Sequence, residues 1–146
     1  MPKKGFTLIE LLVVVAVLGV LATVAMVRLT GPERGARDSR RQSDLKQYQT
    51  SLEVYANRNN GLYPIVNGAA HTVLCAPLGL SGCPTDPQGT NPYQYQSNAG
   101  GTTYVLYALL ERPVGGVAVN YVSCSNGKNG TVAVTTNIAN GVCPLP

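Results

Sequence analysis

The chain has 146 residues, of which 45% are hydrophobic and only 12% are charged, and its formal net charge is +4. Lys3 and Lys4 lie in the first five residues, so the remainder carries a side-chain charge of +2 (4 − 2). This charge is too small to indicate nucleic-acid binding by itself. The length suits one modest folded domain of about 110 residues beyond an apolar N-terminal stretch.

The apolar stretch runs from Phe6 to Val27, where only Thr7, Glu10 and Thr23 are more polar than alanine. Its 22 residues make a helix roughly 33 Å long at about 1.5 Å per residue, enough to cross a hydrocarbon core of roughly 30 Å. The sequence therefore predicts a transmembrane helix over residues 6–27. The run is too long for the core of a secretory signal peptide, so we expect it to stay in the mature protein.

Glu10 lies inside this predicted membrane helix. A carboxylate near a bilayer interior costs a few kcal/mol on insertion scales and indicates a functional role. One interpretation is that Glu10 only reaches back to the headgroups. The other depends on cleavage after Gly5, which would make Phe6 the new N-terminus. The amine of one chain could then neutralise Glu10 of a neighbour, because buried charges are tolerated when they are paired.

Residues 4–10, KGFTLIE, and the apolar run that follows resemble the N-terminal signature of type IV pilins and the related pseudopilins. The resemblance covers about the first 25 residues. It implies that a prepilin peptidase cleaves between Gly5 and Phe6 and methylates the new Phe6 amine, and that Glu10 guides filament assembly. It also implies a pilin fold, α+β, with a long N-terminal helix packed on a small antiparallel sheet.

The flanking charges give opposing signals for topology. Lys3 and Lys4 favour an N-terminus inside the cell, whereas several arginines follow the helix. The cleavage signature requires an inside N-terminus. The four cysteines lie beyond residue 70 and suit an oxidising exterior. We therefore expect the N-terminus inside.

Residues 28–60 are predicted to form the amphipathic second half of the long helix. Gly31-Pro32 predicts a kink or break, after which the helix resumes. Opposite charges four residues apart indicate a solvated, salt-bridged face: Glu33–Arg37, Arg34–Asp38 and Arg40–Asp44. Binding of DNA or of an acidic surface is the alternative for these arginines. An apolar stripe then follows at helical spacing: Leu45, Tyr48, Leu52, Tyr55 and Ala56.

Residues 61–146 are predicted to form a globular head. Turn signals fill residues 61–101, and strands are expected at 103–110, 114–122 and 130–138, with a short one near Tyr93. Three or four strands would pack across residues 45–56. Three segments are similar to the heads of major pseudopilins and some pilins: Gly61-Leu62-Tyr63-Pro64, Pro84-Thr85-Asp86-Pro87-Gln88-Gly89 and Tyr93-Gln94-Tyr95.

The four cysteines allow three disulfide pairings. Local spacing favours Cys75–Cys83 and Cys124–Cys143. The alternative, a tetrahedral metal site, lacks any Cys-x-x-Cys pair. Each disulfide would contribute about 2–4 kcal/mol, which is useful to a subunit outside the cell.

No catalytic centre, metal or cofactor is predicted. The one histidine, His71, lies among small residues, and no nucleophile has a visible histidine and carboxylate beside it. Major pseudopilins often hold calcium in a carboxylate-rich C-terminal loop, but no Asp or Glu follows Glu111, so we expect no such site. The sequon at residues 129–131 indicates a turn. Strand packing accounts for a set of alternating tyrosines: Tyr93, Tyr95, Tyr104 and Tyr107.

The sequence thus predicts a leader (1–5), a core helix (6–27), an amphipathic helix (28–60) and a head (61–146). The main hypothesis is a structural, non-enzymatic subunit of a type IV pilus. The nearest alternative is a major pseudopilin of type II secretion or of a competence apparatus. A third hypothesis makes the head an adhesin or DNA-binding module. Expected partners are copies of itself, the prepilin peptidase, the assembly machinery of the inner membrane and the membrane. The precursor would lie in the cytoplasmic membrane and the filament on the cell surface.

Overall fold

The computed structural model describes residues 5–25 and 30–146. The chain divides into two compact units, Met1–Pro32 and Glu33–Pro146, each considered by itself below. The first unit holds helix α1 (Leu8–Ala25), whose large apolar side chains are exposed. The predicted span over residues 6–27 extends into residues outside the described part. Within the described residues, no helix is both long and apolar enough to cross a membrane.

Helix α2 (Thr30–Arg58) begins two residues before Pro32. Gly31 and Pro32 therefore lie in its first turn, where the missing N–H of proline removes no intrahelical hydrogen bond. The prediction that Pro32 is a favourable first-turn residue is confirmed, although the helix begins two residues earlier than expected. Residues 26–29, between the two helices, lie outside the described residues.

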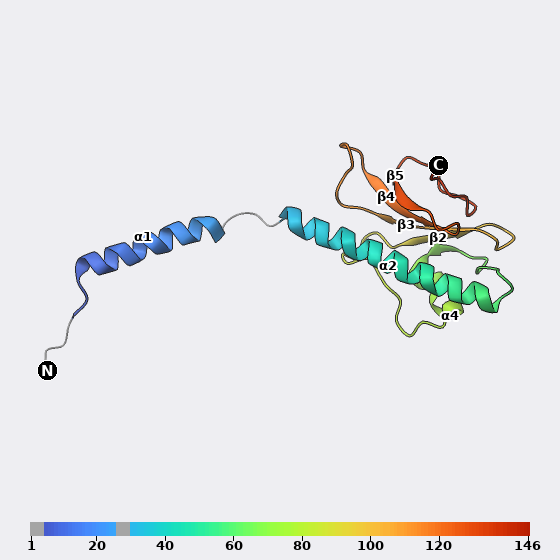
Figure 1. Cartoon of the computed structure of the whole chain (residues 1–146), viewed down its shortest axis with the longest axis horizontal. Helices are drawn as coiled ribbons and strands as arrows, with labels where there is room; N and C mark the ends of the chain where they lie inside the picture. The colour runs from blue at the N-terminus through green and yellow to red at the C-terminus, as the bar shows by residue number, and fades with distance from the viewer. Residues whose placement is uncertain (1–4, 26–29) are drawn as a thin grey trace. The chain divides into compact units, whose positions relative to one another are not determined.

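The head is built around a five-stranded antiparallel sheet with the strand order β1-β2-β3-β4-β5 (Figure 1). The strands are β1 (Asn67–Ala69), β2 (Gln94–Ser97), β3 (Tyr104–Leu109), β4 (Val119–Cys124) and β5 (Asn129–Ala133). Two short helices follow β1 directly: α3 (Ala70–Val73) and α4 (Cys75–Leu78). Each strand pairs with its neighbour in sequence, so the sheet is a simple meander. The prediction of an α+β pilin fold is confirmed, with one strand more than expected.

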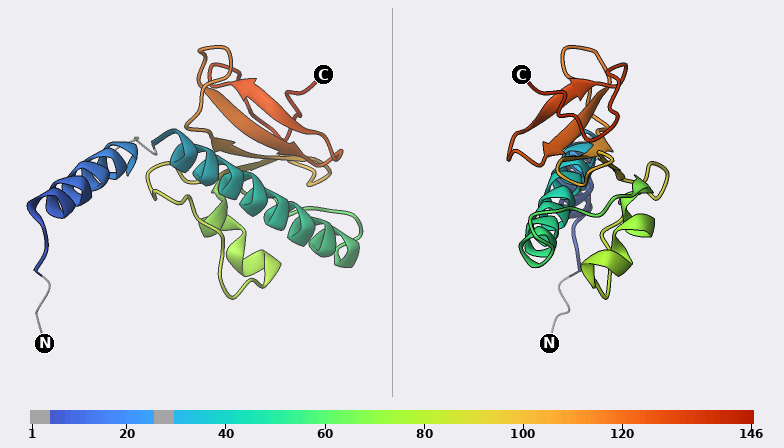
Figure 2. Two further views of the ribbon diagram at one scale, coloured as in Figure 1. Left: turned by 60° about the vertical axis from the view of Figure 1, so that its left-hand side comes forward. Right: turned by 90° about the vertical axis from the view of Figure 1, so that its right-hand side faces the viewer.

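One face of the sheet packs against α2 and the short helices, which lie on the same side of it in both views of Figure 2. Side chains of β3 alternate between the two faces, as a strand requires. Tyr104, Leu106 and Ala108 join the buried cluster with Leu45 and Leu52 of α2. The apolar stripe predicted on the helix is therefore the main contact that holds α2 on the sheet.

The opposite face of the sheet is covered by the C-terminal segment. Val105 and Val122 are fully buried there, and Ile138 and Leu145 pack against them. The disulfide between Cys124 and Cys143 lies in the same cluster. The C-terminal tail therefore forms a third layer, which gives the sheet an apolar core on both faces.

Strand boundaries differ from the prediction where glycines shape the turns. The segment 114–118, predicted as the start of a strand, is a hairpin in which Val114 and Val117 exchange two backbone hydrogen bonds of 3.0 Å. Gly115 and Gly116 both have positive φ, 58° and 80°. That backbone suits a two-residue hairpin turn of type I′. The β4 strand proper begins only at Val119.

Candidate assembly site and the ion-pair cluster of the head

The N-terminal candidate residues lie at the start of α1. Phe6 is 87% exposed, and Glu10 lies in the first turn of the helix. The Oε2 atom of Glu10 accepts hydrogen bonds from the backbone N–H of Thr7 at 3.0 Å and from its hydroxyl at 2.9 Å. The backbone N–H of Glu10 in turn donates to Oγ1 of Thr7 at 3.3 Å. Thr7 and Glu10 therefore form a reciprocal capping box at the helix start.

This capping box gives Glu10 a role that the sequence reasoning missed, although the Thr-x-x-Glu spacing at residues 7–10 is its known signature. The two residues satisfy backbone donors that the first helical turn leaves without partners. In the isolated chain the carboxylate is therefore occupied by its own Thr7. A neighbouring amine that pairs with Glu10 would have to share or replace these hydrogen bonds.

The head contains a second cluster, around Arg41 on α2. Its guanidinium is buried, and Nε lies 2.6 Å from Oδ1 of Asp86. Its Nη1 atom lies 2.9 Å from Oδ1 of Asp38 and 2.7 Å from Oε1 of Glu111. Arg37 adds a bidentate pair with Glu111, at 2.7 and 2.6 Å. Two arginines and three carboxylates thus join α2, the loop that carries Asp86 and the segment that follows β3.

The carboxylates of the cluster also hold the backbone. Asp38 accepts the N–H groups of Glu111 at 2.9 Å and Arg112 at 3.1 Å. Asp86 accepts the N–H of Gln88 at 3.0 Å. These ion pairs and hydrogen bonds offset the cost of removing the charges from water. The cluster fixes where the segment after β3 leaves the sheet.

The ion pairs of the cluster shift the pKa values of Arg41 and Glu111. Burial by itself would lower the pKa of Arg41, but hydrogen bonds with Asp86, Glu111 and Asp38 outweigh it and raise this pKa. The hydrogen bonds from Arg37, with those from Arg41, lower the pKa of Glu111 to about 2 against the opposing effect of burial. Arg41 and Glu111 therefore stay ionised across the ordinary pH range.

The predicted solvated face of α2 is only partly right. Glu33–Arg37 and Arg40–Asp44 do approach each other, at 3.9 Å each. Asp38, however, pairs with Arg41 and Arg112 rather than with Arg34. Arg41 and Asp38 are buried because the loop with Asp86 and the segment after β3 fold over them, which helical spacing alone could not indicate.

A smaller polar group lies at the other end of α2. The carboxylate of Glu53 accepts hydrogen bonds from the hydroxyls of Tyr63, at 3.1 Å, and Tyr104, at 3.3 Å. Burial, with the nearby Glu53, raises the pKa of Tyr63 to about 12. The rings of Tyr63 and Tyr104 meet edge to face with centroids 4.6 Å apart. Tyr104 therefore serves packing, as predicted for the alternating tyrosines, and Tyr63 packs against it.

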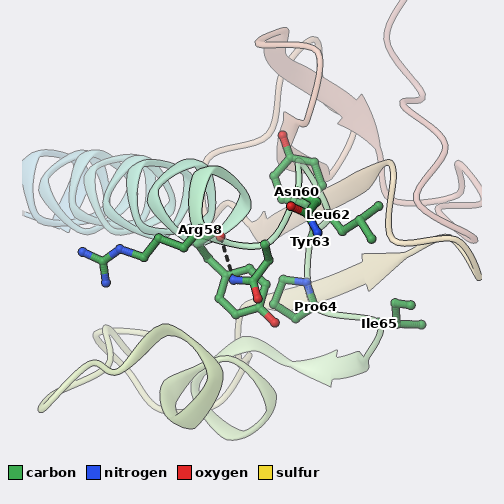
Figure 3. A pocket seen from close by; sticks show the side chains of 8 residues that line it. Arg58, Asn60, Leu62, Tyr63, Pro64 and Ile65 are labelled. Atoms are coloured by element: carbon green, nitrogen blue, oxygen red, sulfur yellow. Dashed lines mark hydrogen bonds between the residues drawn. The ribbon is translucent and has the colours of Figure 1, made fainter.

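A surface hollow of about 500 Å³ lies where α2 ends. Figure 3 shows its wall of Leu62, Pro64 and Ile65, with Arg58 on the other side. Leu62 and Ile65 are exposed, and Tyr55 also lines the hollow. Tyr55 belongs to the predicted apolar stripe, but it is only half-buried because it faces this hollow.

Disulfides join Cys75 to Cys83 and Cys124 to Cys143, the pairing that local spacing favours, with Cα atoms 5.8 and 5.6 Å apart. The first closes a loop after α3. His71 is exposed on α3. Within residues 5–25 and 30–146, no three His, Cys, Asp or Glu side chains are arranged to hold a metal ion.

The chain was compared with known proteins. Residues 1–26 match the family described as the prokaryotic N-terminal methylation motif. The type II secretion system core protein G of Pseudomonas aeruginosa is 30% identical over 119 residues, covering 73% of this chain and 82% of the relative. The core protein G of Vibrio cholerae is 28% identical over 73% of this chain and 80% of the relative. That of Aeromonas hydrophila is 30% identical over 65% and 73%. No solved structure gives a significant match.

Proposed function

The chain belongs to the family of type II secretion system core protein G, and on this premise we propose that it is the major subunit of a secretion pseudopilus. The protein is structural, and many copies would assemble into one homopolymeric filament. This proposal favours the pseudopilin alternative over the main hypothesis of a type IV pilus. The observation that carries it is the extent of the similarity, which reaches through most of the chain rather than the N-terminal motif alone.

The proposed assembly begins with processing. The methylation motif over residues 1–26 supports cleavage between Gly5 and Phe6 by a prepilin peptidase and methylation of the freed amine. The precursor would be anchored in the cytoplasmic membrane by its apolar N-terminal segment, with the basic leader inside. The head, with its two disulfides, would lie on the oxidising side of that membrane.

Two features of α1 support its role as the filament core. Its large apolar side chains are exposed, so bundling with other copies would bury them. In the proposed filament the amine of Phe6 in one copy pairs with Glu10 of its neighbour. The capping box supports a two-stage version of this hypothesis: Thr7 holds the carboxylate in the free subunit, and the neighbour's amine takes it over on assembly.

The adhesin and DNA-binding hypotheses gain less support. Arg41 is buried and Arg37 binds Glu111, so two of the arginines behind the DNA hypothesis serve the interior of the head. Roles in motility and adhesion stay predictions. The proposed partners are copies of this chain, the peptidase and the assembly machinery of the inner membrane.

The experiment that tests this function is deletion of the chain in its native cell, with complementation by the wild type. We expect the deletion to abolish export of proteins that leave through type II secretion, while long surface filaments are unaffected. The wild-type chain, but not Glu10→Ala, restores export. Normal export in the deletion strain, together with loss of long surface filaments, would favour the type IV pilus instead.

A further inference from the structure

The hairpin between β3 and β4 carries an apolar surface that the fold does not bury. Residues 113–118 are all exposed and carry no charge. Val114 is 56% and Val117 52% exposed, and backbone hydrogen bonds of 3.0 Å join these two residues across the turn. Because its own hydrogen bonds order the turn, both valine side chains are available for contact with an apolar environment. Residues 113–118 are called the apolar tip below.

Two exposed arginines lie at the base of the apolar tip. Arg112 directly precedes the tip, and its side chain is 60% exposed. Its Nη1 atom lies 3.3 Å from the position that a side chain at Gly35 would occupy, so the guanidinium lies over the first turns of α2. Arg34, the neighbour of Gly35 in the chain, is also exposed. Figure 1 and the left view of Figure 2 show the β3–β4 hairpin at the end of the head where α2 begins.

The exposed charge at this end of the head is positive. Among the acids that the structure describes there, Glu33 is exposed, with 62% of its side chain accessible, and it already lies 3.9 Å from Arg37. Asp38 and Glu111 are only 1% and 17% exposed, and both belong to the ion-pair cluster. The two exposed arginines therefore outnumber the exposed carboxylate, and the surface that flanks the apolar tip is basic.

We propose that the apolar tip and its two arginines bind the anionic lipid headgroups of the membrane before the subunit enters a filament. The inference rests on the proposed membrane-anchored precursor and adds a contact of the head to it. Valine side chains on a narrow turn enter the boundary between headgroups and acyl chains. Arg34 and Arg112 bind the phosphates of the lipids around them.

Two observations select a lipid surface as the partner. The first is the combination of exposed valines with flanking arginines, because a bilayer offers an apolar layer directly beneath a layer of phosphates. The second is the course of the chain, since only residues 26–29 separate α1 from α2 in the sequence. That stretch spans at most about 18 Å even when fully extended. In a precursor anchored by its apolar segment, the first turns of α2 and the arginines beside them are therefore tethered close to the headgroups.

Fluorescence quenching of the full, processed chain in lipid vesicles tests the contact. Val114→Cys is labelled with an environment-sensitive dye, since the four native cysteines are closed in disulfides. The vesicles are phosphatidylcholine, with or without one third phosphatidylglycerol, and carry a nitroxide quencher at the depth of the headgroups. We expect strong quenching with phosphatidylglycerol and weak quenching without it. The matched control is Ile65→Cys, which is 60% exposed and lies beside Gly101, before the start of β3, and it should stay unquenched.

Removal of the arginines separates lipid recognition from tethering alone. Arg34→Gln and Arg112→Gln should each lower the ratio of lipid-bound to free tip about fivefold in the anionic vesicles. Arg58→Gln is the matched control, because this exposed arginine ends α2 about 36 Å from Arg34, and it should leave the ratio unchanged. The three variants should keep the wild-type melting temperature, which shows that the head remains folded.

The outcomes separate this inference from the proposed function. Equal quenching at positions 114 and 65 overturns the lipid contact. Quenching at position 114 that needs neither phosphatidylglycerol nor the two arginines shows that tethering alone brings the tip to the bilayer, and it also overturns the proposal. A dye signal that grows with protein concentration but is not quenched by the lipid indicates contact between copies and does the same. These results leave the proposed function intact, whereas a wild-type chain that does not float with the vesicles overturns both.

Discussion

Arg41 and Asp86 form a buried ion pair, with Nε of the arginine 2.6 Å from Oδ1 of the aspartate, although 45 positions separate them in the sequence. The pair joins the middle of α2 to the loop of Asp86, which the Tyr48 hydroxyl also holds by donating to the carbonyl oxygen of Pro84 at 2.9 Å. Glu111 and Asp38 complete the partners of the same guanidinium. The order of the head therefore depends on one arginine that three separate segments share.

Removal of Arg41 tests this dependence. Arg41→Met keeps much of the side-chain volume but leaves buried carboxylates without their counter-ion, which should destabilise the head by about 3–5 kcal/mol. Denaturant unfolding of the full purified chain in detergent measures the loss of unfolding free energy. The matched control is Arg40→Met, one residue earlier and 66% exposed, where the change should stay within about 1 kcal/mol. Equal stability of the two variants would contradict the role of the cluster.

The pH dependence of stability follows from Glu111. Hydrogen bonds from Arg37 and Arg41 lower its pKa from 4.5 to about 2 in the folded chain. A group with a lowered folded pKa stabilises the fold fully above its unfolded pKa, and this contribution disappears as the pH falls through the folded value. The free energy of unfolding should therefore fall between about pH 4.5 and pH 2.

The variant Glu111→Gln isolates this contribution. The difference in unfolding free energy between wild type and variant should be largest above pH 4.5 and should shrink toward pH 2. Glu33→Gln, an exposed control on the same cluster's edge, should follow the wild-type curve. A difference that stays constant from pH 7 to pH 2 would contradict the pairing.

The sequence indicated the larger elements of the fold because their signals are local. Helical spacing identified the stripe from Leu45 to Ala56, and β-branched and aromatic residues identified β3. The short β1 strand and helices α3 and α4 were missed, since three or four residues carry no periodic pattern. Their order comes from packing on the sheet and from the Cys75–Cys83 disulfide.

The two candidate sites also differ in how far apart their residues lie in the sequence. The Thr7–Glu10 capping box was missed, although its spacing alone carries the signal because both partners lie in one helical turn. The cluster around Arg41 carries no such local signal, because two of its acids, Asp86 and Glu111, come from distant segments. Charges four residues apart on α2 suggested a solvent-facing network, whereas the fold buries its central arginine. The interpretation of a solvated face used only residues close in sequence, and burial by distant segments contradicts it at Arg41.

The backbone at Gly141 provides a test of how the C-terminal tail closes over the sheet. Its φ is 65°, and an added Cβ would lie 2.5 Å from the carbonyl oxygen of Thr103. Gly141→Ala should cost at least about 1–3 kcal/mol from the left-handed backbone alone, with the clash in addition. Gly82→Ala is the control, since nothing lies within 4 Å of its added Cβ and its φ is not in the left-handed region. Thermal unfolding of both variants gives the comparison, and matching melting temperatures would contradict the close approach.

Substitutions at Thr7 and Glu10 separate capping from charge pairing. Glu10→Gln keeps an oxygen for the capping box but loses the charge, so it should insert normally and fail to assemble. Thr7→Val removes the hydroxyl cap at a cost of about 1 kcal/mol but keeps the charge, so it should still assemble. Fractionation into membrane and sedimentable filament measures both. Assembly by Glu10→Gln at the wild-type level would show that charge pairing is not required.

The central claim is that the chain enters a filament only after the Gly5–Phe6 bond has been cut and the amine of Phe6 released. Tandem mass spectrometry of the N-terminal peptide from sedimentable native material tests it most directly. The account predicts a peptide that begins at Phe6 with a methylated amine. Assembled material that still begins at Met1, with Lys3 and Lys4 attached, would contradict it.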